Sequence, residues 1–303
     1  MCTERDRRVR GSSGVIIRSS MYFFPVLLLA LGLTGYACAQ SGPGAALRQY
    51  DLDGTPVARI ELPAELTEIS GLAFTGDGRL LAHGDERAII YQIEFPGGKV
   101  VKRFAIGDAG GPLVGDFEDI QVVGDHVFLV TSAGVLVEAT EGRDGQTVPV
   151  LRRSRGLGGA CEVEGLSWDQ DSSSMLLLCK QTSGKRWKDQ LVILAVNPAT
   201  GEFEPEPRLT VSHADLKRAT GVKGFAGSAM VRHPSTGSLI LVSGPERAVA
   251  EIDASGKVLA GGRLHTKRHR QPEGIAIAPD LTLLISDEGA GAKATITGYA
   301  SRR

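Results

Sequence analysis

Three glutamates occupy equivalent positions in a repeated four-residue signature, which makes them the first candidates for chemistry in this chain. The signature opens a short apolar segment five times, and its first residues are Ser70, Glu118, Glu164, Ser228 and Glu273. Successive copies begin 48, 46, 64 and 45 residues apart. Equivalent residues converge when repeated units are arranged around an axis, so we expect the three carboxylates to lie close together.

Neighbouring carboxylates cannot all remain ionised without a positive charge between them, because like charges raise one another's pKa. A hard cation is one solution, since Ca²⁺ accepts about six to eight oxygen ligands in a flexible arrangement. Glu118, Glu164 and Glu273, together with Asp287, are therefore candidate calcium ligands. Lys180 could instead neutralise one glutamate as an ion pair.

Two other roles for the glutamates are open. They could accept hydrogen bonds from backbone N–H groups of a neighbouring unit, which would make the ring structural. They could also act directly as general acid and base. Asp116 and Asp119, beside Glu118, could add ligands to a metal.

A second set of polar residues should face the same opening, because it lies at the ends of the second strands, 14 to 16 residues after each signature residue. This set is Asp85, Ser132, Lys180, Ser243 and Asp287. Basic residues gather in nearby loops, at 152–155, 185–188, 217–223 and 267–270. Clustered ammonium and guanidinium groups either form a solvated rim or suit phosphate and carboxylate partners.

From these two sets we expect a small anionic ligand, or a protein partner, to bind at the opening. The residues predicted to contact it are Ser70, Asp85, Lys180, Ser228, Arg268 and Arg270.

The elements that position these residues all read as β-strands. Each signature begins a strand, a turn follows, and a second apolar run such as 127–130 comes next. Third runs follow at 88–93, 135–139, 191–196, 248–252 and 295–299, and fourth strands are expected at 100–106, 148–151, 208–211 and 257–264. An apolar period of 3.6 residues is sustained nowhere, so no helix is expected.

Four-stranded antiparallel units at this spacing predict an all-β fold, a β-propeller. The signature count gives five blades, and the 64-residue gap leaves room for a sixth. However, 202–224 is rich in charge, proline and glycine and reads as a long loop. The last unit has only three strands, so we expect the strand at 56–62 to complete it and close the ring.

Composition bounds the class of protein. The chain has 303 residues, 42% of them hydrophobic, and a formal net charge of −1. This is typical of a soluble globular domain with ample material for a core. Binding of nucleic acid is not expected, because it requires a basic excess or stripe.

The N-terminus reads as a targeting segment. Basic residues at 7–18 precede an apolar run at 23–33, and the small residues at 37–39 suit cleavage before Gln40. We expect a signal peptide at 1–39, a linker at 40–45 and a single propeller domain at 46–303. Lipidation at Cys38 and an uncleaved membrane anchor are alternatives, and all three readings export the domain to the periplasm or the exterior.

Export permits disulfides, and Cys161 and Cys179 remain in the mature chain. They flank one predicted hairpin. Pairing Glu164 with Cys179 across its turn leaves Cys161 about three residues out of register, and a bridge needs Cα atoms within about 7 Å. The sequence therefore favours two free, buried cysteines over a disulfide.

The five signatures in order, with the surrounding residues, carry a family resemblance. The segments 116–120, 163–166, 227–229 and 271–275 and the flanking pieces 234–239 and 285–289 resemble the SdiA-regulated family of exported bacterial β-propellers. More distantly the chain looks like phytase-like and calcium-dependent lactonase-like propellers. The resemblance implies the fold and export but no particular activity. Thr131 and Ser132 stand where relatives often carry an acidic–basic pair, so that wall of the site is expected to differ.

The sequence thus predicts an exported, monomeric propeller that binds a ligand or partner at its axial mouth, with Ca²⁺ as the expected cofactor. The alternative from another class is a metal-dependent hydrolase of phosphate esters or lactones, in which the metal activates water. A third hypothesis is a protein-interaction scaffold with a purely structural ring. The histidines show no metal-ligand spacing and no Gly-x-Ser-x-Gly motif is present, so whether the protein is an enzyme is undecided.

Overall fold

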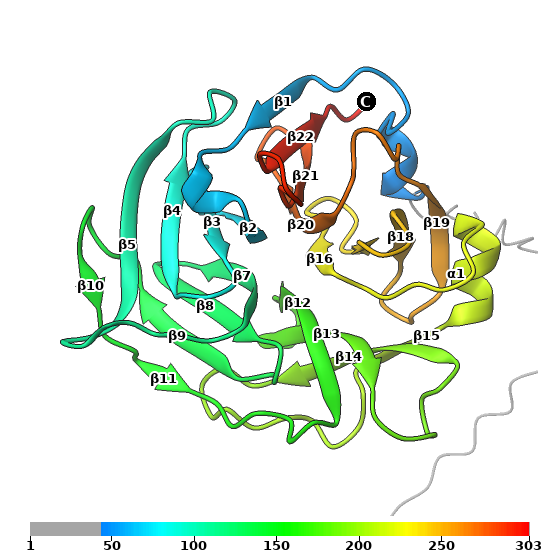
Figure 1. Ribbon diagram of the computed structural model, residues 1–303. Helices are drawn as coiled ribbons and strands as arrows, with labels where there is room; N and C mark the ends of the chain where they lie inside the picture. Colours follow the sequence, from blue (N-terminus) through cyan, green and yellow to red (C-terminus); the bar gives the residue numbers. More distant parts are fainter. Residues whose placement is uncertain (1–43, 303) are drawn as a thin grey trace, which may run out of the picture. The chain divides into compact units, whose positions relative to one another are not determined.

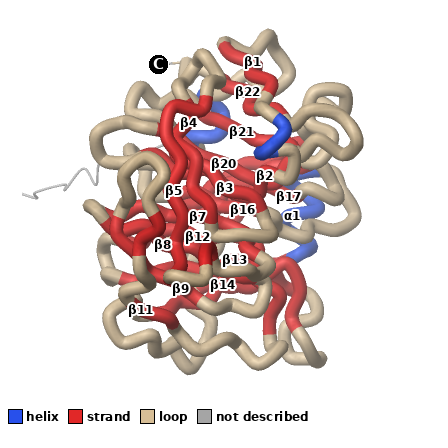
Figure 2. Tube along the Cα trace, turned by 60° about the vertical axis from the view of Figure 1, so that its left-hand side comes forward, coloured by secondary structure: helices blue, strands red, loops and turns tan. Residues whose placement is uncertain are grey.

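The computed structural model describes residues 44–302, so the predicted signal peptide at 1–39 lies outside it. Almost all regular structure in the described part is strand (Figure 2). The strands form five sheets whose cores are four-stranded and antiparallel, arranged as propeller blades (Figure 1). The predicted all-β propeller with five blades is confirmed.

Each blade is a simple meander from the propeller axis outward, and its strands are as follows. Blade 1 is β2 (Ile69–Phe74), β3 (Leu80–Gly84), β4 (Ile89–Ile93) and β5 (Val100–Asp108); blade 2 is β7 (Phe117–Val123), β8 (His126–Thr131), β9 (Leu136–Thr140) and β11 (Arg152–Arg153). Blade 3 is β12 (Cys161–Asp169), β13 (Ser174–Thr182), β14 (Gln190–Val196) and β15 (Leu209–Ser212); blade 4 is β16 (Ala229–Arg232), β17 (Leu239–Ser243), β18 (Ala248–Ile252) and β19 (Val258–Arg263). Blade 5 is β20 (Pro272–Ile277), β21 (Leu283–Asp287), β22 (Thr295–Tyr299) and β1 (Ala58–Glu61).

The N-terminal strand closes the ring, as the sequence predicts. β1 pairs antiparallel with β22, with Ile60 opposite Ile296. The five inner strands β2, β7, β12, β16 and β20 contact one another in a closed cycle, which brings the starts of the strands to one axial mouth (Figure 1). Closure leaves each blade flanked by two others and removes free blade faces.

The apolar core is divided into five clusters, and each lies between two adjacent blades. Leu81, Ile90 and Val127, for example, are fully buried between blades 1 and 2. Because both faces of a blade are covered, its middle strands are continuous apolar runs instead of alternating ones. This burial explains why runs such as β13 could be recognised directly in the sequence.

The structure corrects two predicted elements. The region at 202–224 contains a short helix, α1 (His213–Thr220), where only a loop was expected. Ser212 caps its first turn by accepting a hydrogen bond from Asp215 N, and Gly221 ends it at φ 72°. With Leu216 and Thr220 as its buried residues, this helix is too short to show a sustained period.

The second correction concerns the outer edge of blade 2. Its fourth strand is β11 at 152–153, where 148–151 was predicted. The short strand β10 (Thr147–Val148) instead pairs in parallel with β5 of blade 1 and covers that edge. Three minor elements complete the description: β6 (Gly111–Pro112), which pairs with β5, and the 3₁₀ turns η1 (Ala46–Gln49) and η2 (Ala64–Leu66). In the described part of the chain, no helix is long and apolar enough to cross a membrane.

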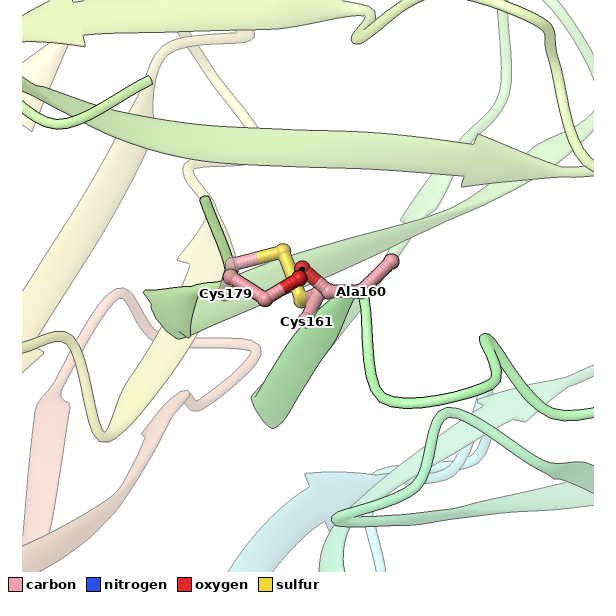
Figure 3. Close-up of a disulfide and its surroundings, with 4 residues drawn as sticks. Ala160, Cys161 and Cys179 are labelled. Atoms are coloured by element: carbon pink, nitrogen blue, oxygen red, sulfur yellow. Dashed lines mark hydrogen bonds between the residues drawn. A yellow bond between two sulfur atoms is a disulfide. The ribbon is translucent and has the colours of Figure 1, made fainter. Parts of the chain in front are cut away.

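Cys161 and Cys179 form a disulfide between β12 and β13 (Figure 3). Their Cα atoms are 5.6 Å apart, so the preference for free cysteines was wrong. That prediction assumed regular pairing of the two strands. In the structure the register shifts twice, between Glu162 and Val163 and between Val163 and Gly165, and a bulged strand bends locally.

Removal of this bond should destabilise the protein without changing its fold. The bridge closes a loop with a sequence separation of 18 residues, for which the chain-entropy model gives about 3 kcal/mol of stabilisation. The double variant Cys161→Ser/Cys179→Ser should therefore unfold at lower urea concentration than the oxidised protein. The reduced wild-type protein is the control and should match the variant, whereas an unchanged midpoint in both would contradict the assignment.

Candidate functional site

In four of the five inner strands, the signature residue lies within a β-bulge. The ladder with the second strand skips Ser70, Glu118, Glu164 and Glu273. A bulge leaves its extra residue out of the ladder and re-aims its side chain. In the remaining blade, Ser228 comes directly before the first residue of β16. The five residues consequently stand at the same end of the inner strands, at what we call the acidic mouth.

A lysine lies among the glutamates of the acidic mouth. The Nζ of Lys180, on β13, is 2.9 Å from Glu164 Oε1 and 3.8 Å from Glu162 Oε1. Glu164 is only 5% exposed. Burial acts to raise the pKa of Glu164, and Lys180 opposes this but does not cancel it. The ion pair considered in the sequence analysis is thus present in the structure.

One ammonium group does not balance the remaining carboxylates. Burial, together with the charges of Glu164 and Asp116, raises the pKa of Glu118 to about 9. Burial, together with the charges of Glu288 and Glu164, raises the pKa of Glu273 to about 7. Near neutral pH, Glu118 is therefore protonated. Glu273 is present in both its protonated and its ionised form.

Glu288 belongs to this cluster, whereas its neighbour Asp287 was the residue predicted from the sequence. The ladders align Asp287 with Gly84 of blade 1, so the equivalent of Asp85 is Glu288. Burial, with Asp85 as the largest charge contribution, raises the pKa of Glu288. Successive side chains of a strand point to opposite faces, and aligning the blades by ladder position would have selected Glu288.

Asp287 is engaged in a different, buried network. Its Oδ2 lies 2.8 Å from His269 Nδ1, and its Oδ1 accepts a hydrogen bond from Gln271 N at 3.2 Å. The other nitrogen of His269 lies 2.6 Å from the hydroxyl of Tyr299. Both carboxylate oxygens of Asp287 are committed to these contacts. His269, predicted as part of a basic rim, is fully buried.

Asp119 performs the blade-locking role that was considered for the glutamates. Its Oδ1 accepts from Ile120 N at 2.8 Å, and its Oδ2 accepts from Leu166 N of the next blade at 2.7 Å. The room for this carboxylate comes from Gly71 of the preceding blade, where an added Cβ would lie 2.7 Å from Asp119 Oδ1. The same Cβ would lie 2.6 Å from Nε2 of the buried His83. Gly71 is therefore required by close packing between blades.

Three other predicted contact residues, Ser228, Ser70 and Asp85, have different surroundings. Ser228 lies inside the acidic mouth, where its Oγ accepts from Gly244 N at 2.9 Å and hydrogen bonds with Glu273. Ser70 is buried, and its Oγ donates to Glu68 O at 3.4 Å. Asp85 is half-buried near Glu288.

The predicted basic rim is only partly formed. Arg268 donates to Leu52 O at 3.0 Å and to the Tyr299 hydroxyl at 3.3 Å, so it anchors the N-terminal segment to blade 5. Arg152 and Arg153 lie in β11, the outermost strand of blade 2. Arg270 is exposed, as are the lysines at 185 and 188 in the loop that follows β13.

The described residues contain no group of three or more histidine, cysteine, aspartate or glutamate side chains that could hold a metal ion. Two features account for this in the predicted calcium site. Lys180 occupies the position beside Glu164 that a cation would take, and Asp287 is bound to His269. Calcium binding stays a prediction, and it would require Lys180 to move away from Glu164.

Comparison with known families agrees with the signature. The model of the SdiA-regulated family matches residues 46–291, which is most of the chain. The chain belongs to the SdiA-regulated family. No curated protein matches the sequence of this SdiA-regulated propeller.

Solved structures share the fold of this SdiA-regulated protein at low sequence identity. Glutaminyl cyclase from Myxococcus xanthus is 14% identical, with a TM-score of 0.50, over 81% of this chain and 97% of that one. A glucose dehydrogenase is 12% identical, with a TM-score of 0.50, over 80% of this chain and 98% of that one. At such identities the likeness establishes the propeller architecture alone.

The raised pKa values make the stability of this SdiA-regulated protein fall as pH rises. Native Glu118 and Glu273 hold protons that unfolded glutamates release, so the free energy of unfolding should decrease from about pH 4.5 to pH 9. Glu118→Gln mimics the protonated form and should make the decrease between pH 7 and pH 9 smaller, while the buried Asp119, whose pKa is also raised, still contributes to it. Urea unfolding at pH 5, 7 and 9 measures this effect.

Glu61→Gln removes an exposed carboxylate from the outer strand of blade 5 and provides the matched control, which should keep the decrease seen in the wild type. The titration of Lys180, whose pKa is raised above 10.5, lies beyond this pH range. Parallel pH profiles for Glu118→Gln and the wild type would contradict the proposed protonation of Glu118.

Proposed function

We propose that this protein is an exported propeller whose acidic mouth binds the positively charged group of a ligand, such as an ammonium or guanidinium group. The observation that carries the proposal is the charge imbalance among Glu118, Glu164 and Glu273, which share the ammonium group of Lys180, while Glu288 adds a further carboxylate. Protons make up the deficit in the free protein. A cationic ligand can replace those protons and pair with the carboxylates they neutralise.

The sign of the ligand differs from the one expected from the sequence. Basic loops suggested an anionic ligand, but Arg268 is held by Leu52 and Tyr299, and His269 is buried. An anion entering the mouth would raise the pKa values of Glu118 and Glu273 further and would be repelled above pH 7. A cation experiences the opposite effect, because it lowers both pKa values and is held by the ionised forms.

Export has independent support in the chemistry of the chain. Disulfides persist in oxidising compartments, and Cys161 and Cys179 are bonded here. The basic, apolar and small residues at 7–39 provide the corresponding export signal. We therefore propose that the protein acts in the periplasm or outside the cell.

No specific observation favours the two other functions considered from the sequence, a metal-dependent hydrolase and a protein-interaction scaffold. A hydrolase would need a metal at the mouth, and Glu164 is paired with Lys180 instead. A scaffold with a purely structural ring would need the glutamates to bond backbone groups, but Asp119 performs that task. Ca²⁺ remains an alternative cation for the same carboxylates.

Calorimetric titration with spermidine, CaCl₂ and inorganic phosphate distinguishes these functions. Spermidine should bind with release of protons, detected as a dependence of the measured heat on the ionisation enthalpy of the buffer. Its affinity should rise between pH 6 and pH 9 as Glu273 and then Glu118 become ionised. Glu118→Gln and Glu273→Gln should each weaken binding about tenfold or more, which corresponds to the loss of one charge-assisted contact.

Glu61→Gln is again the control and should leave spermidine binding unchanged. Binding of CaCl₂ in place of spermidine, abolished by Glu164→Gln, would support the calcium alternative. Phosphate binding without spermidine binding, or spermidine binding that is independent of pH, would overturn the proposal.

A further inference from the structure

A separate cavity opens at the other ends of the inner strands. Its volume is about 460 Å³, and residues from all five inner strands line it. Four half-buried apolar side chains surround it, and they come from blades 1, 3, 4 and 5: Phe74, Trp168, Val231 and Ile277. We call this feature the apolar mouth. Its volume falls within the range of about 300–1,000 Å³ that is typical of small-molecule sites.

The apolar mouth is distinct from the acidic mouth. Its lining residues begin two positions after the signature residue of each inner strand, as at Leu72 and Leu166, and extend into the turns that follow, such as Gln170 and Asp171. Phe74, Trp168 and Ile277 stand four residues after their signature residues. A strand rises about 3.3 Å per residue, so they lie roughly 13 Å further along the strands.

Two polar side chains of the lining, Gln121 and Arg232, are bonded within the protein. Gln121 donates to Val122 O at 3.0 Å and accepts from Trp168 N at 3.3 Å. The guanidinium group of Arg232 pairs with Asp169 at 2.7 Å and with Asp171 at 2.6 Å. Arg232 therefore offers a ligand no uncompensated charge.

The histidine of the lining is likewise engaged. His233 is fully buried, its Nδ1 accepts from Ser235 N at 3.3 Å, and its Nε2 lies 3.2 Å from the Tyr50 hydroxyl. Burial lowers the pKa of His233, which favours the neutral ring. With Arg232 paired and its histidine buried, the cavity presents polar and apolar surface in about equal parts, and the apolar part includes Phe74 and Trp168.

We propose that the apolar mouth is a second ligand site, and that it binds an uncharged aromatic molecule or the uncharged aromatic part of a larger one. Apolar surface removed from water at Val231 and Ile277 supplies affinity. Phe74 and Trp168 supply ring faces and edges, which favour aromatic partners beyond the area they bury. The five converging strands limit the size of the ligand.

A pair of related fluorescent probes tests this site in the full mature protein. N-phenyl-1-naphthylamine is uncharged, and 8-anilino-1-naphthalenesulfonate is a closely similar molecule that carries a sulfonate. The uncharged probe should bind saturably at one site per chain and at least about tenfold more tightly than the anionic probe, because Arg232 is already neutralised. Tighter binding of the sulfonate would overturn the proposal.

Tryptophan fluorescence locates the bound probe. The chain has two tryptophans, and Trp187 does not line this cavity. Energy transfer from tryptophan to N-phenyl-1-naphthylamine should persist in Trp187→Phe and fall by more than half in Trp168→Phe. Equal transfer in the two variants would place the probe elsewhere and contradict the site.

Substitution at the rim provides the second test. Ile277→Arg places a charge at the cavity and should weaken binding of the uncharged probe about tenfold or more. Val57→Arg is the control, since Val57 is 61% exposed outside the cavity, and should bind like the wild type. Unchanged affinity in a folded Ile277→Arg variant, or the absence of saturable binding to the wild type, would refute the proposal. Spermidine binding at the acidic mouth should be unaffected by Ile277→Arg, so the two proposals can fail separately.

Discussion

Four of the five inner strands carry a bulge at their first residues, and the bulge decides which side chains reach the propeller axis. A regular ladder would pair Glu118, Glu164 and Glu273 with the second strands and direct them into the cores between blades. The bulge takes them out of the ladder. Burial and mutual repulsion then raise the pKa values of Glu118 and Glu273, and the resulting protonation is the basis of the proposed preference for cations.

The surrounding structure holds these bulged strands in place. Asp119 joins blades 2 and 3 through Leu166 N, in space that Gly71 leaves free. The disulfide of Cys161 and Cys179 spans the bulge from which Glu164 projects. Partly ionised, half-buried carboxylates oppose folding near neutral pH. A cross-link and a buried interblade hydrogen bond next to them compensate for part of that cost.

The two mouths differ in chemistry because the inner strands change character along their length. Their signature residues are serine or glutamate, and the residues four positions later are aromatic, aliphatic or, at Arg232, ion-paired. One axis thus carries an acidic opening at one end and, at the other, an opening lined by aromatic and aliphatic side chains beside polar ones. One end is proposed to bind a cationic group and the other an uncharged aromatic group, and the two sites are proposed to act independently.

Much of this fold could be predicted from the sequence, because buried blades leave continuous apolar runs and the signature repeats at a nearly constant interval. Ring closure by β1 could be predicted because the last repeat unit has only three strands in the sequence and needs a fourth. The side-chain partners could not be predicted in the same way. Choosing Glu288 over Asp287, or recognising the disulfide, requires the register of the strand pairs. Bulges shift that register by one residue, and the amino-acid sequence does not reveal where they occur. The helix α1 was not predicted because its two buried residues, Leu216 and Thr220, are too few to establish a helical period in the sequence.

Direct titration of the glutamate carboxyl groups tests the central claim, that the bulged glutamates retain protons near neutral pH. Carbon-13 NMR of protein labelled at the glutamate side-chain carboxyl, recorded from pH 4 to pH 10, resolves the individual groups. Glu118→Gln and Glu273→Gln assign the two signals by their disappearance. The structure predicts one carboxyl that titrates near pH 7 and one near pH 9. Titration of both groups near the ordinary glutamate value of about 4.5 would contradict the account.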